Sequence, residues 1–424
     1  MAFETKIAYC TNVHAGPDLA GVKKNLSLFT LKVRQSLLDS GDWLADEPLG
    51  VGLWLADSAA REVLIGDELH QLREWLNQHG LLAFTLNGFP QNNFHQAIVK
   101  HRVYEPTWWQ VERFDYTRRL IQILHTLMPE GQLGSISTLP IAWSVPQPTH
   151  DEKKRSADHL KQIAIELDRL RQACNREIVI AIEPEPGCAI TDGRSMRTFF
   201  EQYLFDDADR DLVARHITVC HDICHAAVMR EDQANEVAAY RDHGIRIGKV
   251  QVSSAIEVDW SEMSPSQRTA AFQHLAGFAE DRYLHQTTVY QQHSQQIELH
   301  EDLPELMKSI LTPELLHGSW RVHFHVPIFY SKAGPLNTTQ RDILKCMHSL
   351  YSVEALNDNL TSNRCFTGHL EVETYAWSVL PESHRGTSLA EDIASELRYL
   401  RLLVRKKVFP RPNKSLHLRG EEDR

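Results

Sequence analysis

The sequence has no uninterrupted run of about 18 or more apolar residues, the length that a membrane-spanning helix needs, so no membrane insertion is expected. It also has no excess of positive charge, because 45 Lys and Arg stand against 56 Asp and Glu, a net charge of -11. Nucleic acids and anionic membranes are bound through positive charge. The composition therefore argues against nucleic acid as a partner. We interpret the basic cluster from Arg405 to Lys414 as a solvated tail.

Cysteine is also scarce. The 7 Cys residues are an odd number without paired spacing, which is typical of reduced thiols rather than of a disulfide framework. The stretch from Met1 to Lys6 shows no basic segment followed by an apolar one, so no secretory signal is expected. We therefore expect a cytoplasmic protein.

Three common motifs are missing. The sequence has no G-x-G-x-x-G, no P-loop and no G-x-S-x-G. Dinucleotide binding, nucleoside triphosphate chemistry and serine hydrolysis consequently lose support.

The sequence does contain a regular alternation of short apolar runs and amphipathic stretches, which indicates parallel strands joined by helices and hence the α/β class. The clearest predicted helices are Ala59–Asn77, Glu112–Met128, Ala157–Cys174 and Leu389–Val404. The nine predicted strands are Ile7–Cys10, Val51–Leu55, Leu81–Leu86, Ser135–Thr138, Ile178–Ile182, Ile217–Cys220, Ile247–Val252, Val322–Val326 and His369–Val372.

The pattern inside these strands favours a closed (β/α)8 TIM barrel over an open sheet. In the runs Ile178–Glu183, Lys249–Ser253 and His369–Glu373, one face is aliphatic and the other carries polar groups. A barrel interior with polar side chains at its C-terminal mouth accepts this pattern on many strands, whereas an open sheet covered by helices on both faces does not. A (β/α)8 barrel has eight strands, so one of the nine predicted strands must be an accessory strand or a loop. We assign that role to Val322–Val326.

We predict a single domain over residues 1–410 and a polar tail over 411–424. Two stretches, about 92–111 and 254–321, are longer than ordinary connections. Both follow strands, so in a barrel they are long insertions at the C-terminal face that can wall a pocket.

Polar side chains at strand ends point to a metal site. Glu183, Asp222, Gln251 and one of Glu371 and Glu373 lie in or just after consecutive predicted strands. Oxygen ligands of this kind suit Mg²⁺ or Mn²⁺, and Zn²⁺ if histidines take part.

Further candidate contacts to metal or substrate surround this set. His225 follows Asp222 by three residues, and His323 and His325 share one face of an extended segment. Cys220 and Cys224 lack a second cysteine pair, so two buried structural thiols are the simpler interpretation. The remaining candidates are His14, Asn87 and Lys249.

These elements resemble the xylose isomerase-like barrels, the superfamily of sugar and sugar-phosphate isomerases and epimerases. Over nearly the whole length the chain is similar to one subgroup, the EboE-type metabolite traffic proteins, which are implicated in the movement of secondary-metabolite precursors. The segments that carry the similarity are Tyr9–His14, Asn87–Pro90, Gly134–Thr138, Ile182–Pro186, His323–Pro327 and His369–Tyr375.

The resemblance implies a TIM barrel with one divalent ion at its C-terminal mouth. Matched by chain order, the implied ligands are Glu183, Asp222, Gln251 and a glutamate of the last strand, for which Glu373 is preferred because it lies nearer the strand end. If the site is catalytic, the residue types at the strand ends predict proton transfer in a hydroxy-carbonyl compound by way of a metal-bound enediolate, with Glu183 and Glu373 as the pair that removes and returns the proton.

The resemblance leaves alternatives open. The long insertion and the His323 segment depart from the isomerases, so a non-catalytic metabolite carrier on an isomerase scaffold is the second hypothesis. An endonuclease IV-like hydrolase is the third, and the acidic charge disfavours it. The expected partner is a small polyhydroxy or hydroxy-carbonyl metabolite; a homodimer and contacts with proteins of the same gene cluster stay open.

Overall fold

The computed structural model describes residues 4–14, 16–96, 98–205, 209–352, 365–386 and 388–408. Within these residues, eight parallel strands close into a barrel in the order β1-β14-β7-β6-β5-β4-β3-β2, which confirms the predicted fold class. The barrel strands are β1 (Lys6–Cys10), β2 (Leu49–Trp54), β3 (Leu81–Asn87), β4 (Leu133–Thr138), β5 (Glu177–Ile182), β6 (Ile217–Asp222), β7 (Ile247–Val252) and β14 (His369–Val372).

The alternation along these strands separates an apolar outer face from a partly polar interior. Lys249 and Glu371 form an ion pair of 2.5 Å between Nζ and Oε2, and both side chains are fully buried. The Ser135 hydroxyl donates to Thr85 Oγ1 (2.8 Å) and lies 2.9 Å from His369 Nδ1. Because polar groups inside a barrel can pair with each other across strands, the interior tolerates them.

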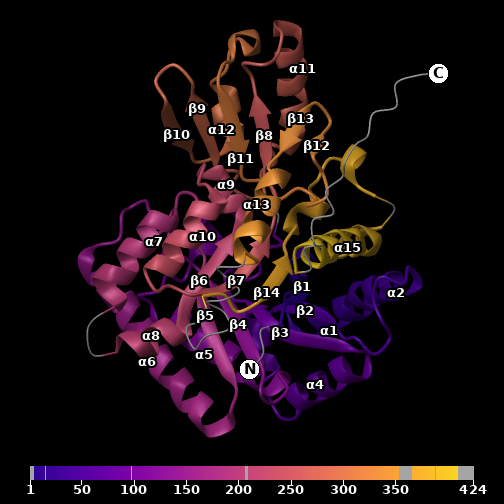
Figure 1. Cartoon of the computed structure of the whole chain (residues 1–424), viewed down its shortest axis with the longest axis vertical. Helices are drawn as coiled ribbons and strands as arrows, with labels where there is room; N and C mark the ends of the chain where they lie inside the picture. Colours follow the sequence, from indigo (N-terminus) through magenta and orange to yellow (C-terminus); the bar gives the residue numbers. More distant parts are fainter. Residues whose placement is uncertain are drawn as a thin grey trace, which may run out of the picture.

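Helices cover the outside of the barrel (Figure 1). The described helices around the barrel are α1 (Leu19–Asn25), η2 (Leu26–Thr30), α2 (Leu31–Asp39), α3 (Asp57–Glu62), α4 (Glu68–Gln78), α5 (Val111–Leu127), α6 (His150–Cys174), α7 (Gly193–Phe199), η4 (Phe200–Leu204), α8 (Arg210–His216), α9 (Ile223–Val228), α10 (Gln233–Asp242), α13 (Gln340–Leu350) and α15 (Leu389–Val408). Short 3-10 turns at the strand ends and loops are η1 (Thr11–His14), η3 (Lys100–Tyr104), η7 (Tyr375–Ser378) and η8 (Glu382–His384).

Two helix predictions need correction. The helix predicted over Ala59–Asn77 is two helices, α3 and α4, because Gly66 between them adopts a left-handed backbone with φ of 59° that ends helical pairing. The helix predicted from Ala157 begins at His150. Thr149 caps it, accepting a hydrogen bond from the Glu152 amide while the Glu152 side chain accepts one from the Thr149 amide.

The second long insertion folds into an antiparallel sheet at the C-terminal end of the barrel (Figure 1). Its strand order is β10-β9-β11-β8-β13-β12, and it extends to Thr338, beyond the predicted end at 321. Its elements are β8 (Ile256–Asp259), α11 (Pro265–Leu275), η5 (Ala276–Phe278), β9 (Thr287–Gln291), β10 (Gln296–His300), α12 (Leu303–Lys308), η6 (Pro313–Leu315), β11 (Ser319–Val322), β12 (Lys332–Ala333) and β13 (Leu336–Thr338).

The ninth predicted strand, Val322–Val326, contributes only Val322 to a strand of this sheet, and the rest of it forms a connecting segment. That segment is held by hydrogen bonds from the His323 amide to Gln286 O and from the Val326 amide to Ser254 O. The chain from His323 to Val326 is therefore fixed between the inserted sheet and the end of β7.

The two insertions contact each other. The backbone amides of Val99 and Lys100, in the first insertion, donate to Arg282 O in the second at 2.9 and 3.1 Å. Lys100 Nζ also donates to Asp302 Oδ2 at 2.8 Å. Both insertions thus cover the same end of the barrel. Among the described residues, no helix has the length and apolar character needed to cross a membrane.

Candidate metal centre

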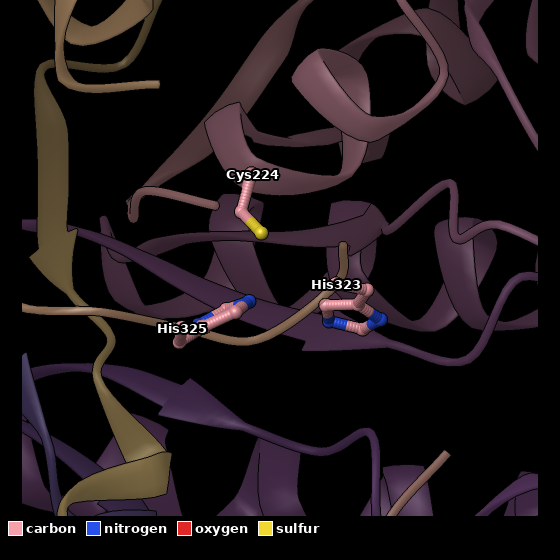
Figure 2. Close-up of side chains that lie close together, drawn as sticks. All are labelled: Cys224, His323 and His325. Atoms are coloured by element: carbon pink, nitrogen blue, oxygen red, sulfur yellow. The ribbon is translucent and has the colours of Figure 1, made fainter. Parts of the chain in front are cut away.

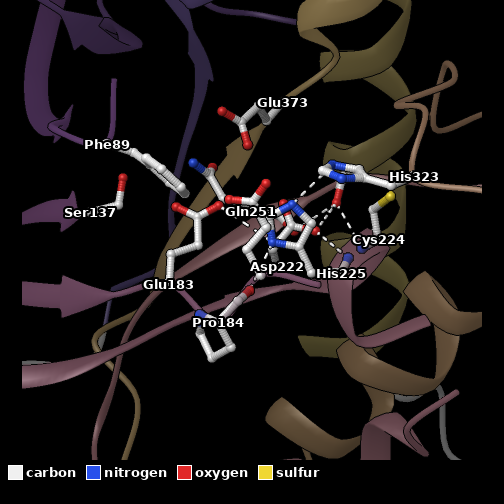
Figure 3. Close-up of polar contacts among 12 residues, drawn as sticks. Phe89, Ser137, Glu183, Pro184, Asp222, Cys224, His225, Gln251, His323 and Glu373 are labelled. Atoms are coloured by element: carbon white, nitrogen blue, oxygen red, sulfur yellow. Dashed lines mark hydrogen bonds and ion pairs between the residues drawn. The ribbon is translucent and has the colours of Figure 1, made fainter. Parts of the chain in front are cut away.

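Three carboxylates meet at the C-terminal end of the barrel. Glu183 follows β5, Asp222 ends β6 and Glu373 follows β14, and one oxygen of each lies within 4.8 Å of the others. All three side chains are buried (Figure 3). Parallel strands place their carboxyl ends at one rim, which explains why residues so distant in sequence converge.

Asp222 is oriented by two hydrogen bonds to one of its oxygens. Oδ1 accepts from the His225 amide, as the N-cap of α9, and from the Ser253 hydroxyl, both at 2.8 Å. Oδ2 has no hydrogen-bond partner and faces the neighbouring groups. A carboxylate held through one oxygen leaves the other available as a ligand.

The last barrel strand supplies Glu373, and not Glu371, to this cluster. Glu373 Oε1 accepts hydrogen bonds from Asn12 Nδ2 (2.6 Å) and Asn87 Nδ2 (3.0 Å). Glu371 lies deeper in the barrel, in its ion pair with Lys249. Lys249 is thereby occupied with Glu371 and does not line the cavity described below.

Gln251 lies in β7 beside the carboxylates (Figure 3). Its side chain is fully buried, yet neither Oε1 nor Nε2 has a hydrogen-bond partner. Glu183 Oε2 and Asp222 Oδ2 share this property. Buried polar atoms are nearly always paired, so a convergent set of unpaired atoms is typical of a place where an ion, a ligand or water binds.

The charges of the cluster repel one another. Burial raises the pKa of Glu183 well above its ordinary value, and the charges of Glu373 and Asp222 raise it further. Burial likewise raises the pKa of Glu373, with Asp222 and Glu371 adding to the effect. Burial alone would raise the pKa of Asp222, but His225, His325 and the two donated hydrogen bonds hold it below its ordinary value.

A divalent cation fits this arrangement. It would neutralise three converging carboxylates and satisfy buried oxygens that have no hydrogen-bond donor. Carboxylate and amide oxygens are the donors that Mg²⁺ and Mn²⁺ prefer. The predicted ligands Glu183, Asp222, Gln251 and Glu373 therefore form a chemically consistent donor set.

Three histidines stand beside the carboxylates, and two of them, His323 and His325, are drawn in Figure 2. His225 Nδ1 lies 3.9 Å from Glu183 Oε1, and His325 Nε2 lies 3.9 Å from Asp222 Oδ2. His225 Nε2 and His323 Nε2 are 3.1 Å apart. Burial lowers the pKa of His325 to about 4 and that of His323 well below its ordinary value.

The cluster opens into a cavity of about 90 Å³ between the barrel and both insertions. The barrel contributes polar groups, and the insertions contribute aromatic and basic ones. Residues that line this cavity include Asn12, Asn87, Glu183, Glu373, His225, His323, His325, Lys100, Tyr104, Glu185, Tyr283 and Tyr375.

Several of these residues were not predicted. Glu185 is buried and accepts hydrogen bonds from Tyr104 Oη (2.7 Å) and Gln286 Nε2 (3.4 Å). Burial raises its pKa. The position of Glu185, two residues after Glu183, is the sequence feature that could have identified it as a site residue. Tyr104 and Gln286 come from insertions whose fold the sequence does not indicate.

One predicted contact lies elsewhere. The His14 ring stacks on Phe29 and its Nε2 lies 3.0 Å from the Tyr9 hydroxyl. His14 is absent from the lining of the cavity. Burial lowers its pKa to about 4, as expected for a neutral imidazole packed in the core.

Several solved structures are similar to this chain, all at low identity. L-ribulose 3-epimerase is 13% identical over 66% of this chain and 80% of that chain, with a TM-score of 0.39. The probable 3-DHS dehydratase AsbF from Bacillus anthracis, involved in petrobactin synthesis, is 12% identical over 93% of this chain and 98% of that one, with a TM-score of 0.42. The IolI protein with a bound zinc atom is 12% identical over 59% and 73%, with a TM-score of 0.36.

No curated protein matches the sequence. The family described as xylose isomerase-like TIM barrel matches residues 50–280, which is more than half of the chain and runs from β2 through the Glu183 and Asp222 strands into the second insertion. The eight-stranded parallel barrel agrees with that match. The chain belongs to the xylose isomerase-like TIM-barrel family.

Proposed function

We propose that this protein binds a divalent cation through Glu183, Asp222, Gln251 and Glu373 and isomerises or epimerises a small sugar, sugar phosphate or other hydroxy-carbonyl compound. The observation that carries the proposal is the convergence of three buried carboxylates, two of which have an unpaired oxygen, at the floor of a cavity. Membership of the xylose isomerase-like family supports it.

When bound, the ion supplies Lewis-acid polarisation of a substrate carbonyl and hydroxyl, which acidifies the adjacent C–H. The protein supplies the bases. Glu183 lines the cavity, and its Oε2 has no hydrogen-bond partner, so that oxygen can accept a proton from a bound substrate. Glu373 lines the same cavity, and Asn12 and Asn87 fix its orientation through Oε1. One carboxylate removes the proton and the other returns it.

The cavity favours a small polar substrate. Its volume is about 90 Å³, and its wall offers Asn87, Tyr104 and Lys100 to hydroxyl or anionic groups. The carboxylates at its floor are buried, and removal from water strengthens electrostatic interactions during proton transfer. Mg²⁺ and Mn²⁺ are the preferred ions because oxygen donors dominate the site.

A carrier role in metabolite traffic, as the similarity to EboE-type proteins suggests, is the second candidate. The observation that favours it is the direct hydrogen bonding of the two insertions over the cavity, which would retain a bound metabolite. The two functions differ in whether a C–H bond is broken, since a carrier needs binding alone.

The experiment starts with the metal content of the purified protein and of Glu183→Ala and Asp222→Ala. We expect about one equivalent of metal at this site in the wild type and its loss in both variants. The protein is then incubated in D₂O with Mn²⁺ and ketoses, aldoses or hydroxypyruvate. Deuterium incorporation at a C–H position supports the isomerase, and binding without exchange supports the carrier. Unchanged metal content in both variants removes the site.

A further inference from the structure

The loop after β5 borders two separate cavities. Glu183 and Glu185, at its start, line the cavity at the carboxylates, whereas residues 189–192 line a second cavity of about 340 Å³. Among the described residues, none lines both cavities. The Glu185 amide donates to Ile190 O at 3.1 Å, so the loop itself separates them. A ligand in the second cavity would therefore leave the proposed metal ligands untouched.

The floor of the second cavity is apolar. Ile141, Ile190 and Phe199 line it, and each of these side chains is at most 4% exposed. The half-buried Tyr203 also lines it, and its ring stacks on Phe199 with ring centroids 5.4 Å apart. The volume lies in the range of roughly 300–1,000 Å³ that is typical of small-molecule sites. Because aromatic side chains pack well against flat rings, the floor suits a ligand with a planar apolar body.

Ile141, in this floor, has a backbone conformation that its side chain disfavours. Its φ of 71° lies in the left-handed region, where a β-branched residue is rarely found. Its carbonyl accepts a hydrogen bond from the Trp108 amide at 3.0 Å, which fixes the segment after β4 in this conformation. Backbone strain of this kind costs about 1–3 kcal/mol and is concentrated at ligand sites. The strain is thus a second observation, independent of the volume, that supports a binding site.

Two cations border the same cavity. Lys153 of α6 is half-buried, and Arg194 of α7 is exposed. Within the described part of the chain, neither side chain has an ion pair or a hydrogen-bond partner. Of the described residues that line the cavity, Asp192 alone is acidic, and its Oδ1 accepts hydrogen bonds from the Ser195 amide and hydroxyl, both at 2.7 Å. The cavity therefore carries an excess of positive charge in a protein whose net charge is -11.

We propose that the second cavity is a binding site for a small aromatic carboxylate. The ring would pack on Ile190, Phe199 and Tyr203, and the carboxylate would pair with Lys153 and Arg194. Charge complementarity selects the anion, because a neutral ring leaves both cations unpaired and a positively charged ligand is repelled by them. Ammonium and guanidinium groups form charge-assisted hydrogen bonds with carboxylates, which are stronger than those between neutral groups.

The test is calorimetric titration of the full-length protein with benzoate as the probe. Benzyl alcohol keeps the ring without the charge, and acetate keeps the charge without the ring. We expect one equivalent of benzoate to bind at least about tenfold more tightly than either of these compounds. Acetate that binds as tightly as benzoate would show general attraction of anions to the surface and would overturn the proposal. Benzyl alcohol that binds as tightly would overturn it as well, because the two cations would then contribute nothing.

Variants at the rim test the site without disturbing the core. Lys153→Met should weaken benzoate binding at least about fivefold, and Arg194→Met should weaken it less, because water and salt screen the exposed guanidinium more strongly. Thr198→Trp, at an exposed lining position, should block the cavity. Lys154→Met, an exposed neighbour on α6 that does not line the cavity, is the matched control and should keep the wild-type affinity. Unchanged affinity in either Lys153→Met or Thr198→Trp overturns the proposal.

A last comparison distinguishes the second cavity from the one at the carboxylates, whose wall contains Lys100. Lys100→Met and Glu183→Gln should both bind benzoate as the wild type does. Loss of binding in Lys100→Met would place the anion in the carboxylate cavity and would overturn the proposal. The titration needs neither turnover nor added metal, so failure of the proposed function is distinguishable from failure of this site.

Discussion

At the scale of single residues, the alternation of polar and apolar side chains predicted which groups enter the barrel, but not what they pair with. Glu371 and Glu373 share a face of β14, and the sequence left either as the candidate ligand. Glu371 is adjacent to Gln251 in register, and it pairs with Lys249, one inward-facing position earlier on β7. The pairing depends on strand register and depth, which a single sequence does not specify.

The Lys249–Glu371 ion pair leads to the first prediction. Lys249→Met should lower the free energy of unfolding by about 3–5 kcal/mol, because it leaves the fully buried Glu371 carboxylate without its cation. Urea denaturation measures the change. The double variant Lys249→Met/Glu371→Leu should regain most of the loss, since a buried ion pair is often replaceable by apolar side chains. A single variant as stable as the wild type contradicts the assignment.

At the scale of elements, the eight barrel strands lie where the apolar runs predicted them, because buried strands of a closed barrel have a strong local signal. Helix ends were less well predicted. The apolar spacing continues through Gly66 from α3 into α4, so the pattern alone indicated one helix. The position of the break depends on the left-handed conformation of that glycine, which periodicity does not report.

Helix α7 begins against a partly buried carboxylate, and this leads to the second prediction. Glu231 Oε1 accepts a hydrogen bond from the Gly193 amide at 2.8 Å. Burial, with the charge of Glu236 next in importance, raises the pKa of Glu231 from 4.5 to about 8. The folded state then keeps a proton that the unfolded state releases above pH 4.5. The contribution of Glu231 to stability therefore falls as the pH rises from about 4.5 to 8, and levels off above that.

Glu231→Gln keeps the acceptor and removes the titration. Between pH 5 and pH 8, the wild type should lose on the order of 2–4 kcal/mol more unfolding free energy than this variant. Denaturant titrations at several pH values measure the difference. Glu262→Gln, at an exposed position, should follow the wild type. Parallel stability profiles for Glu231→Gln and the wild type would show that Glu231 titrates normally.

At the scale of the whole molecule, the barrel was predictable and the inserted sheet was not. Barrel neighbours such as β4 and β5 follow each other in sequence, and their alternation with helices indicates the closed ring. The inserted sheet instead pairs β8 with β11 and β13, across some 60 to 80 residues. Cavity-lining residues such as Tyr283 owe their place to that pairing. The sequence therefore predicted the floor of the site and the insertions that wall it, but not wall residues such as Tyr283 and Tyr104.

The balance of charge at that floor leads to the third prediction, which concerns the stability of the molecule as a whole. In the absence of metal, Glu183, Asp222 and Glu373 repel one another in a buried site, so the chain folds against this repulsion. Removal of metal by a chelator should lower the unfolding temperature, and Mn²⁺ at about 100 times its dissociation constant should restore about 2.7 kcal/mol of unfolding free energy.

The substitution Glu183→Gln should change both the stability of the metal-free protein and its response to Mn²⁺. It removes one of the repelling charges, so the metal-free variant should be more stable than the metal-free wild type. It also removes a ligand, so Mn²⁺ should no longer stabilise it. Thermal unfolding with and without Mn²⁺ measures both effects, with Glu262→Gln as the control that keeps the wild-type response. A metal-free Glu183→Gln less stable than the metal-free wild type would mean that the Glu183 carboxylate is held by hydrogen bonds rather than poised for a cation.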